Sequence, residues 1–300
     1  MPPLAAAAKV PATSANLGPG FDCLGLALDL YLEVHCQTGG AGLRISANEP
    51  DVPLDASNLV YRAMQRVFEA AAKPVPDLEL RIENGIPLSR GLGSSAAAIA
   101  AGLVVANTLL GEPFDQRRLL ALGLPLEGHP DNLAPALFGG LCVSSLADGE
   151  VLSLPVQLAR PPRIVLFIPD FVMPTAEARR VLPESVPRTD AIFNTCRSSL
   201  LVAALAAGDF STLRWAMDDR LHQPYRAALF PALPRLIEAA LRAGAAGAAM
   251  SGAGSTVIAF CEADPAPVAH RLEQAAVALG VAGRGATAQI DVQGARLLSS

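Results

Sequence analysis

Two glycines and two serines stand close together in the string Pro87-Leu-Ser-Arg-Gly-Leu-Gly-Ser-Ser-Ala-Ala97, which we call the phosphate loop. Gly91 and Gly93 let a backbone approach a ligand closely, and the alanine-rich stretch that follows favours a helix. The first amides of that helix would lack partners and carry the positive end of its dipole, which suits phosphate. We therefore expect a nucleotide phosphate against Pro87, Leu88, Ser89, Arg90, Gly91, Leu92, Gly93, Ser94, Ser95, Ala96 and Ala97.

The phosphate loop also has a plainer interpretation, a Gly-Ser turn that caps a structural helix. Gly-x-Gly alone supports both interpretations about equally, whereas Pro87 and the Ser-Ser-Ala-Ala continuation make the longer string more specific. The loop is not a Walker A motif, because it contains no Gly-Lys-Ser/Thr. The hydroxyl of Ser95 is a candidate ligand for magnesium.

Three separated blocks, spread over nearly the whole chain, resemble the GHMP small-molecule kinases. The blocks are Pro11–Asp22 with Gly25, the phosphate loop with Glu127–Ala136 and Phe138–Gly140, and Gly247–Ser255. The first block and the Gly-His-Pro-Asp-Asn string of the second resemble the members of this family that act on homoserine. The phosphate loop alone does not choose a substrate, since mevalonate and galactose kinases carry similar loops.

The resemblance implies an α+β fold, with a ribosomal S5 domain 2-like N-terminal domain in residues 1–155 and a ferredoxin-like C-terminal GHMP kinase domain in residues 156–300. It implies that ATP binds between them with Mg²⁺ and phosphorylates the side-chain hydroxyl of L-homoserine, giving O-phospho-L-homoserine for threonine biosynthesis. Two alternatives stay open: a GHMP kinase for another small alcohol, of mevalonate or sugar type, and a non-catalytic relative that binds ligand. A homodimer is compatible with the family.

L-Homoserine is a zwitterion, so its site needs an acid for the ammonium group and a guanidinium group for the carboxylate. By resemblance, the substrate residues are Asn16, Asp22, Asn132, Thr175, Arg179 and Arg226. Spacing alone favours plainer roles, with Asn16 and Asp22 as turn formers and lone arginines as solvated surface charges. Thr175 and Arg179 are four residues apart, so they would share one face of a helix.

The resemblance also assigns a metal site and a catalytic set. Glu127 and Ser95 are the expected magnesium ligands, although Glu127 alone would more often be a surface carboxylate. Asn132 stands where mevalonate-type relatives place a catalytic aspartate, and Asp131 is expected on a strand-like loop, pointing away from Asn132. We therefore expect catalysis by positioning and charge neutralisation rather than by a strong base, through Asn16, Asp22, Asn132 and Arg179.

Alternating strands and amphipathic helices are expected to hold these residues in place. Strands are predicted at 28–36, 78–82, 141–146, 164–168, 256–261 and 286–292, with a hairpin turn at 147–150. Helices are predicted from 57 to before 74, and at 94–110, 115–122, 188–207, 210–220, 232–243 and 265–279. Ser57 is the predicted cap of the first helix, Asn58 is expected near the adenine by resemblance, and 127–132 is a predicted loop in which His129 has a shaping role.

Composition and charge exclude several other classes of protein. The 300 residues are 51% hydrophobic and 17% charged, which provides ample core and excludes a mostly disordered chain. A net charge of −5 without a Lys/Arg block argues against nucleic-acid or membrane partners. The five cysteines are odd in number and widely spaced, so we expect reduced thiols in a cytoplasmic protein.

Overall fold

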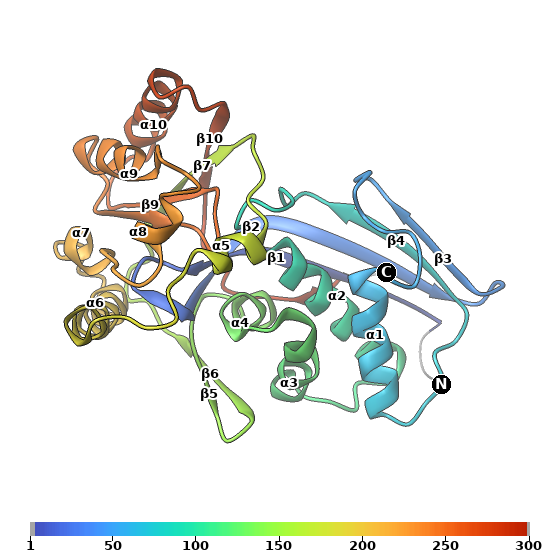
Figure 1. The fold of residues 1–300 in the computed structure, drawn as a ribbon. Helices are drawn as coiled ribbons and strands as arrows, with labels where there is room; N and C mark the ends of the chain where they lie inside the picture. The colour runs from blue at the N-terminus through green and yellow to red at the C-terminus, as the bar shows by residue number, and fades with distance from the viewer. Residues whose placement is uncertain (1–3, 299–300) are drawn as a thin grey trace.

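Two β-sheets form the framework of the computed structural model, which describes residues 4–298 (Figure 1). The first sheet has seven strands, in which β11-β1-β2-β4-β3 lie in order and β5 and β6 continue from β2. All its pairs are antiparallel except β3 with β4. Its strands are β1 (Ala5–Asn16), β2 (Gly20–Thr38), β3 (Leu43–Ala47), β4 (Leu78–Asn84), β5 (Leu141–Ala147), β6 (Glu150–Val156) and β11 (Arg296–Leu297).

Four helices pack against this sheet: α1 (Leu59–Ala70), α2 (Ser94–Leu109), α3 (Gln116–Glu127) and α4 (Pro130–Phe138). Helix α2 is buried on most of its surface, because its alanines allow close approach by its neighbours. At Gly102 an added Cβ would lie 2.2 Å from the carbonyl oxygen of Val60 in α1. The phosphate loop, which precedes α2, is thereby anchored to the centre of the core.

The second sheet has the strand order β10-β7-β9-β8 and is antiparallel throughout, as in a ferredoxin-like fold. Its strands are β7 (Arg163–Pro169), β8 (Gly247–Met250), β9 (Val257–Cys261) and β10 (Gly283–Ala288). Helices α9 (Leu233–Arg242) and α10 (Ala266–Ala278) cover one face. Between β7 and β8 the chain forms α5 (Thr175–Arg180), α6 (Arg188–Ala207), α7 (Leu213–Ala216) and α8 (Gln223–Arg226). The α+β fold expected from the resemblance is confirmed.

The end of the chain returns to the first sheet after β10. Ile290 forms an isolated bridge with Leu28, and β11 pairs with β1. The Asp291 carboxylate accepts hydrogen bonds from the Tyr31 hydroxyl at 2.9 Å and from Arg296 at 2.9 Å. These contacts tie the segment that follows β10 of the second sheet to the first sheet.

Three local predictions are wrong, the first two because side chains form local hydrogen bonds that the periodicity does not reveal. The cap of α1 is Asn58, whose Oδ1 accepts from the Val60 amide at 2.9 Å, and not Ser57. The helix expected at 210–220 shrinks to α7, since the Asp219 carboxylate binds the following amides. The strand expected at 286–292 ends at 288.

The segment 127–132, expected to be a loop, is mostly helical. Helix α3 continues through Pro125 to Glu127, and Gly128 ends it in the left-handed region with φ +86°. Pro130 then occupies the first turn of α4, a position that suits its fixed φ. In the described residues no helix is long and apolar enough to cross a membrane.

Candidate active site

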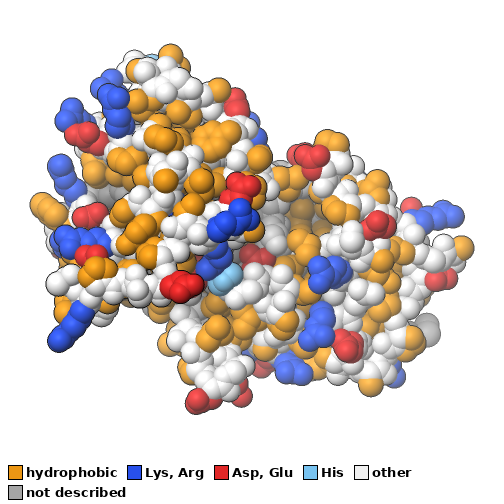
Figure 2. Space-filling model, in the orientation of Figure 1, with side chains coloured by type: hydrophobic (Ala, Val, Ile, Leu, Met, Phe, Trp, Pro, Cys, Tyr) orange, Lys and Arg blue, Asp and Glu red, His pale blue; other side chains and the backbone are white. Residues whose placement is uncertain are grey.

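A cavity of about 610 Å³ lies where the two halves of the chain meet. Its wall combines the phosphate loop, the junction of α3 with α4, and three parts of the second half: Arg179 in α5, Arg226 in α8, and the turn at Gly252. In the space-filling view, basic, acidic and histidine side chains gather beside this hollow (Figure 2). The arrangement places groups of both charges around one enclosed space.

The phosphate loop lines the cavity from residue 87 to residue 95. Ala96 and Ala97 do not reach it, because both are fully buried in α2. The first backbone bond here runs from the Ala97 amide to the Gly93 carbonyl at 2.9 Å, so the preceding amides have no partner within the helix. The N-terminus of α2 is therefore available for an anion.

The two glycines of the loop are sterically required. Both have positive φ, +73° at Gly91 and +66° at Gly93. An added Cβ would lie 2.1 Å from the Ser251 carbonyl oxygen at the first position and 1.8 Å from the Thr13 hydroxyl oxygen at the second. The two glycines thus let the loop pack closely against the Gly247–Ser255 block and against Thr13 of β1, which fixes its place at the cavity wall.

Backbone carbonyl oxygens hold the guanidinium group of Arg90 in place. Its guanidinium donates from Nε to the Pro169 carbonyl at 2.8 Å, from Nη1 to Leu88 at 2.9 Å and from Nη2 to Asp170 at 2.6 Å. Pro169 ends β7, so this side chain fastens the phosphate loop to the second sheet. Its contribution to the cavity is structural support.

Ser95 and Glu127 meet at the edge of the cavity, where the Ser95 hydroxyl donates to the Glu127 carboxylate at 2.8 Å. Burial, and secondarily the negative charge of Asp131, raise the pKa of Glu127 to about 7, while the serine bond lowers it. A hydroxyl and a carboxylate are oxygen ligands of the kind that Mg²⁺ prefers. The pair therefore fits the expected metal, and a cation would remove the cost of ionising Glu127.

Asp131 and Asn132 both line the cavity, from the first turn of α4. The expectation that Asp131 points away on a strand-like loop is wrong, since 130–138 is helical. Asp131 is 3% exposed, and burial together with the charge of Asp22 raises its pKa to about 7. The Asn132 Oδ1 accepts from the Thr13 hydroxyl at 2.8 Å, and its Nδ2 donates to Asp131 Oδ1 at 3.5 Å. A carboxylate and an amide donor thus stand together.

An ion pair joins the two halves across the cavity mouth. Arg179 donates to both carboxylate oxygens of Asp22, from Nη2 at 2.6 Å and from Nη1 at 3.2 Å. Both side chains are about one-third exposed. Arg179 lies in α5, and Thr175 is the first residue of the same helix. Asn16 holds the loop that carries Asp22, because its Oδ1 accepts from the Asp22 amide and its Nδ2 donates to the Gly252 carbonyl at 2.9 Å.

Arg226 lies behind this pair and is 1% exposed. Its Nε donates to the Ala178 carbonyl at 3.1 Å and its Nη1 to the Gly252 carbonyl at 3.0 Å. The guanidinium groups of Arg226 and Arg179 lie 5.4 Å and 5.3 Å from the centre of the Phe21 ring. Two arginines and one aspartate therefore surround one aromatic ring.

Asn58 also lines the cavity, on the side of α1. Its amide is already used, because Oδ1 caps α1 and Nδ2 donates to the Pro53 carbonyl at 2.7 Å. These contacts are those of a helix cap. His129 precedes α4 as its N-cap, and burial followed by the charge of Arg179 lowers its pKa.

Sequence reasoning missed two polar residues around the site. Thr13 orients Asn132, and His222 contacts Arg226 from inside the core. The spacing of His222 and Arg226, four apart, was the available signal for one of them, whereas Thr13 and Asn132 are 119 residues apart and share no local pattern.

An anion cradle at a helix N-terminus, with an acid and a hydroxyl beside it and a charged pocket opposite, defines a two-domain nucleotide-dependent phosphotransferase. Two family models match the chain: GHMP kinases N terminal domain over residues 58–140 and GHMP kinases C terminal over residues 201–278.

Curated relatives and solved structures extend this likeness to the whole chain. The chain is 43% identical over 297 residues to the homoserine kinase of Microchaete diplosiphon, covering 97% of this chain and 96% of that protein. It is 40% identical over 300 residues to that of Desulfitobacterium hafniense, covering 97% and 99%. The crystal structure of homoserine kinase from Cytophaga hutchinsonii superposes with a TM-score of 0.90 at 28% identity, covering 99% and 98%. The chain belongs to the GHMP kinase family, and within it to the homoserine kinases.

Proposed function

We propose that the chain transfers the γ-phosphate of ATP to the side-chain hydroxyl of L-homoserine and releases O-phospho-L-homoserine, a cytoplasmic step of threonine biosynthesis. The observation that carries this proposal is the Asp22–Arg179 ion pair with Arg226 behind it, because both arginines line the cavity that the phosphate loop also lines. The 40–49% identity to curated homoserine kinases supports the same assignment.

The ion pair is suited to a zwitterion because it can exchange both partners at once. The ammonium group of the substrate would replace Arg179 at Asp22, and its carboxylate would bind Arg179 and Arg226. Every charge in this partly buried site then has a partner. An unpaired charge there would cost much free energy. A neutral sugar offers no charge for this exchange, and mevalonate offers a carboxylate without an ammonium group, so both are disfavoured.

The nucleotide side relies on backbone groups. The amides at the start of α2 and the two glycines of the phosphate loop would hold the phosphates. Ser95 and Glu127 would hold Mg²⁺, which when bound neutralises charge on the phosphate oxygens. Because Arg90 is bonded to three carbonyls, its role is to keep this cradle in place.

Catalysis on this proposal rests on positioning and charge. Asn132, with its oxygen bonded to Thr13, presents an N–H donor that stabilises negative charge but cannot accept a proton. A loose, metaphosphate-like transition state requires little assistance from a base. Asn16 and Asp22 would align the substrate, and Arg179 would hold its carboxylate so that the hydroxyl faces the nucleotide.

A coupled ADP-release assay with MgATP and homoserine, mevalonate or galactose tests the proposal. We expect turnover with homoserine and formation of a phosphate ester detected by ³¹P NMR. Turnover of another alcohol without turnover of homoserine would overturn the substrate assignment. Nucleotide binding without phosphoryl transfer to any of them would favour the non-catalytic relative instead.

A further inference from the structure

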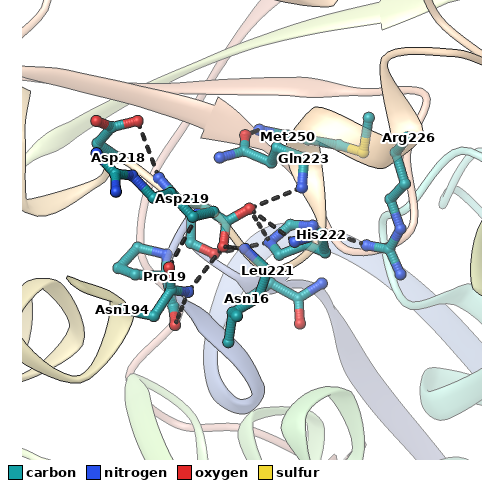
Figure 3. Close-up of polar contacts among 12 residues, drawn as sticks. Asn16, Pro19, Asn194, Asp218, Asp219, Leu221, His222, Gln223, Arg226 and Met250 are labelled. Carbon is teal, nitrogen blue, oxygen red and sulfur yellow. Dashed lines mark hydrogen bonds and ion pairs between the residues drawn. The ribbon is translucent and has the colours of Figure 1, made fainter. Parts of the chain in front are cut away.

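A cluster of buried polar side chains lies behind the substrate arginine, in the segment from Asp219 to Arg226 (Figure 3). The side chain of Asp219 is fully buried, and its Oδ2 accepts from the amides of His222 at 3.0 Å and Gln223 at 2.7 Å. Its Oδ1 accepts from the Leu221 amide at 2.9 Å and from Asn194 Nδ2 at 2.8 Å. Four donors on one carboxylate fix the backbone of this turn, which we call the Asp219 turn.

The ring of His222 is fully buried and has a partner on each nitrogen. Its Nε2 lies 2.7 Å from the Gly18 carbonyl oxygen and 3.6 Å from Asp219 Oδ2, and its Nδ1 lies 3.0 Å from Arg226 Nη1. The carbonyl can only accept, so Nε2 carries the proton. The Nδ1 lone pair then accepts from Arg226. Burial lowers the pKa of His222 to about 4, which agrees with a neutral ring next to a guanidinium group.

These contacts fix which edge of Arg226 is free. Nε is bonded to Ala178, and Nη1 is bonded to both Gly252 and His222. Among the described residues Nη2 has no hydrogen-bond partner, and Arg226 lines the cavity. The two N–H groups of Nη2 are therefore the ones that a substrate carboxylate can meet.

The same cluster holds the loop that carries Asp22. The Gly18 carbonyl accepts from His222, and the Pro19 carbonyl accepts from Asn194 at 3.2 Å. Phe21 stacks on the His222 ring, with centroids 5.3 Å apart and planes inclined by 25°. The His222 ring therefore contacts both Arg226, the proposed partner of the carboxylate, and the loop that carries Asp22, the proposed partner of the ammonium group.

We propose that His222 is a positioning residue that orients Arg226 and fixes its place relative to Asp22, so that the site selects a substrate carrying both an α-ammonium and a carboxylate group. This inference rests on the proposed function, because it assigns the carboxylate to Arg226. His222 contacts neither reacting group and acts through the arginine and the Gly18 loop.

Two substitutions separate the contacts of the ring. In His222→Asn the side-chain oxygen takes the place of Nδ1, so the acceptor for Arg226 is kept while the bond to Gly18 is lost. In His222→Gln the longer amide reaches toward Gly18, and the acceptor for Arg226 is lost. His270→Gln, on the exposed face of α10, is the matched control for the same chemical change.

We expect His222→Gln to raise KM for homoserine about tenfold to a hundredfold, the usual effect of losing a hydrogen bond to a charged group. For His222→Gln, kcat and the KM for MgATP should stay within about threefold of the wild-type values. His222→Asn should raise the KM for homoserine by a factor several-fold smaller than His222→Gln does. Equal increases in the two variants, or parallel increases in KM for both substrates, would overturn the proposal. Wild-type protein that fails to turn over homoserine would instead refute the proposed function.

A measurement on the unaltered protein covers the case in which the variants do not fold. The ¹⁵N shifts of the His222 ring report its tautomer. The chain has four histidines, and the His222 signals are assigned by comparison with the spectrum of His270→Gln and with the signals of the other two histidines. We expect a protonated Nε2 and an unprotonated Nδ1 at pH 7. A protonated Nδ1 would leave no acceptor for Arg226 and would overturn the proposal.

Discussion

Replacing Asp131 by asparagine separates the folding cost of this carboxylate from any role as a base. The side chain is 3% exposed in the first turn of α4 and lines the cavity. Burial, followed by repulsion from Asp22, raises its pKa from 3.8 to about 7, although Arg179 acts in the opposite direction. Asparagine has nearly the same shape and cannot ionise.

The sign of the effect on stability follows from proton linkage. A folded-state pKa above the unfolded value favours the protonated form, so the stability that this group contributes is present below pH 4 and is lost as the pH rises to about 7. The full loss corresponds to about 4 kcal/mol, since each pH unit between the two pKa values is worth about 1.4 kcal/mol. The free energy of unfolding of Asp131→Asn, measured relative to that of wild type, should therefore be about 2–3 kcal/mol higher at pH 8 than at pH 5.

Urea unfolding at the two pH values measures this difference, and Asp77→Asn is the control, because Asp77 is exposed on the segment before β4. A stability difference that does not change between pH 5 and pH 8 would refute the argument from burial. In the ADP-release assay at saturating substrates, we expect kcat of Asp131→Asn to fall less than tenfold. General bases supply about 10² to 10⁴ in rate, so a folded variant with a loss of about 10³-fold or more in kcat would show that Asp131 is the base and that our mechanism is wrong.

Three further substitutions test the cradle, the metal site and the cap of α1. Gly93→Ala should lower kcat/KM for MgATP at least about 100-fold, since a misplaced group near the reacting atoms costs that much, whereas Gly111→Ala, which shares the positive φ but meets nothing within 4 Å, should leave kinetics unchanged. Glu127→Gln should raise the Mg²⁺ concentration for half-maximal activity about tenfold at fixed ATP, because an amide is a weaker ligand than a carboxylate; an unchanged Mg²⁺ titration would contradict the metal assignment. Asn58→Ala should lower the free energy of unfolding by about 1 kcal/mol through loss of the α1 cap, and an unchanged urea midpoint would count against this role.

Elements with a strong local pattern are predictable from this sequence. The helix at 188–207 and the alternating strand at 78–82 occur where the pattern places them, as α6 and within β4. Strand β1 has the sequence Ala-Ala-Ala-Ala-Lys-Val-Pro-Ala-Thr-Ser-Ala-Asn, which lacks β-branched and aromatic residues over much of its length. It is a strand because it pairs with β2 along its whole length, and such tertiary pairing leaves no local signal.

The candidate active site likewise combines features that have a local sequence pattern with contacts that have none. The glycines of the phosphate loop are recognisable because a single residue separates them, and they do line the cavity. The roles predicted for Asn16, Asp22, Asn132 and the arginines stay predictions until tested. The contacts that orient these residues come from distant parts of the chain: Thr13 to Asn132 spans 119 positions, and His222 to Gly18 spans 204. One sequence without its fold cannot reveal which partner a buried donor finds.

The cations of the cavity are distributed unevenly, and this explains how an acidic chain can bind a polyanion. Among the described residues that line it, the only arginines or lysines are Arg90, Arg179 and Arg226. The first is bonded to carbonyl oxygens, and the other two lie around Phe21 on the opposite side. The phosphates would therefore depend on backbone amides and on a metal held by Ser95 and Glu127, while guanidinium groups remain for the small carboxylate. This separation prevents the nucleotide and the amino acid from competing for the same charges, although both are anionic at one end.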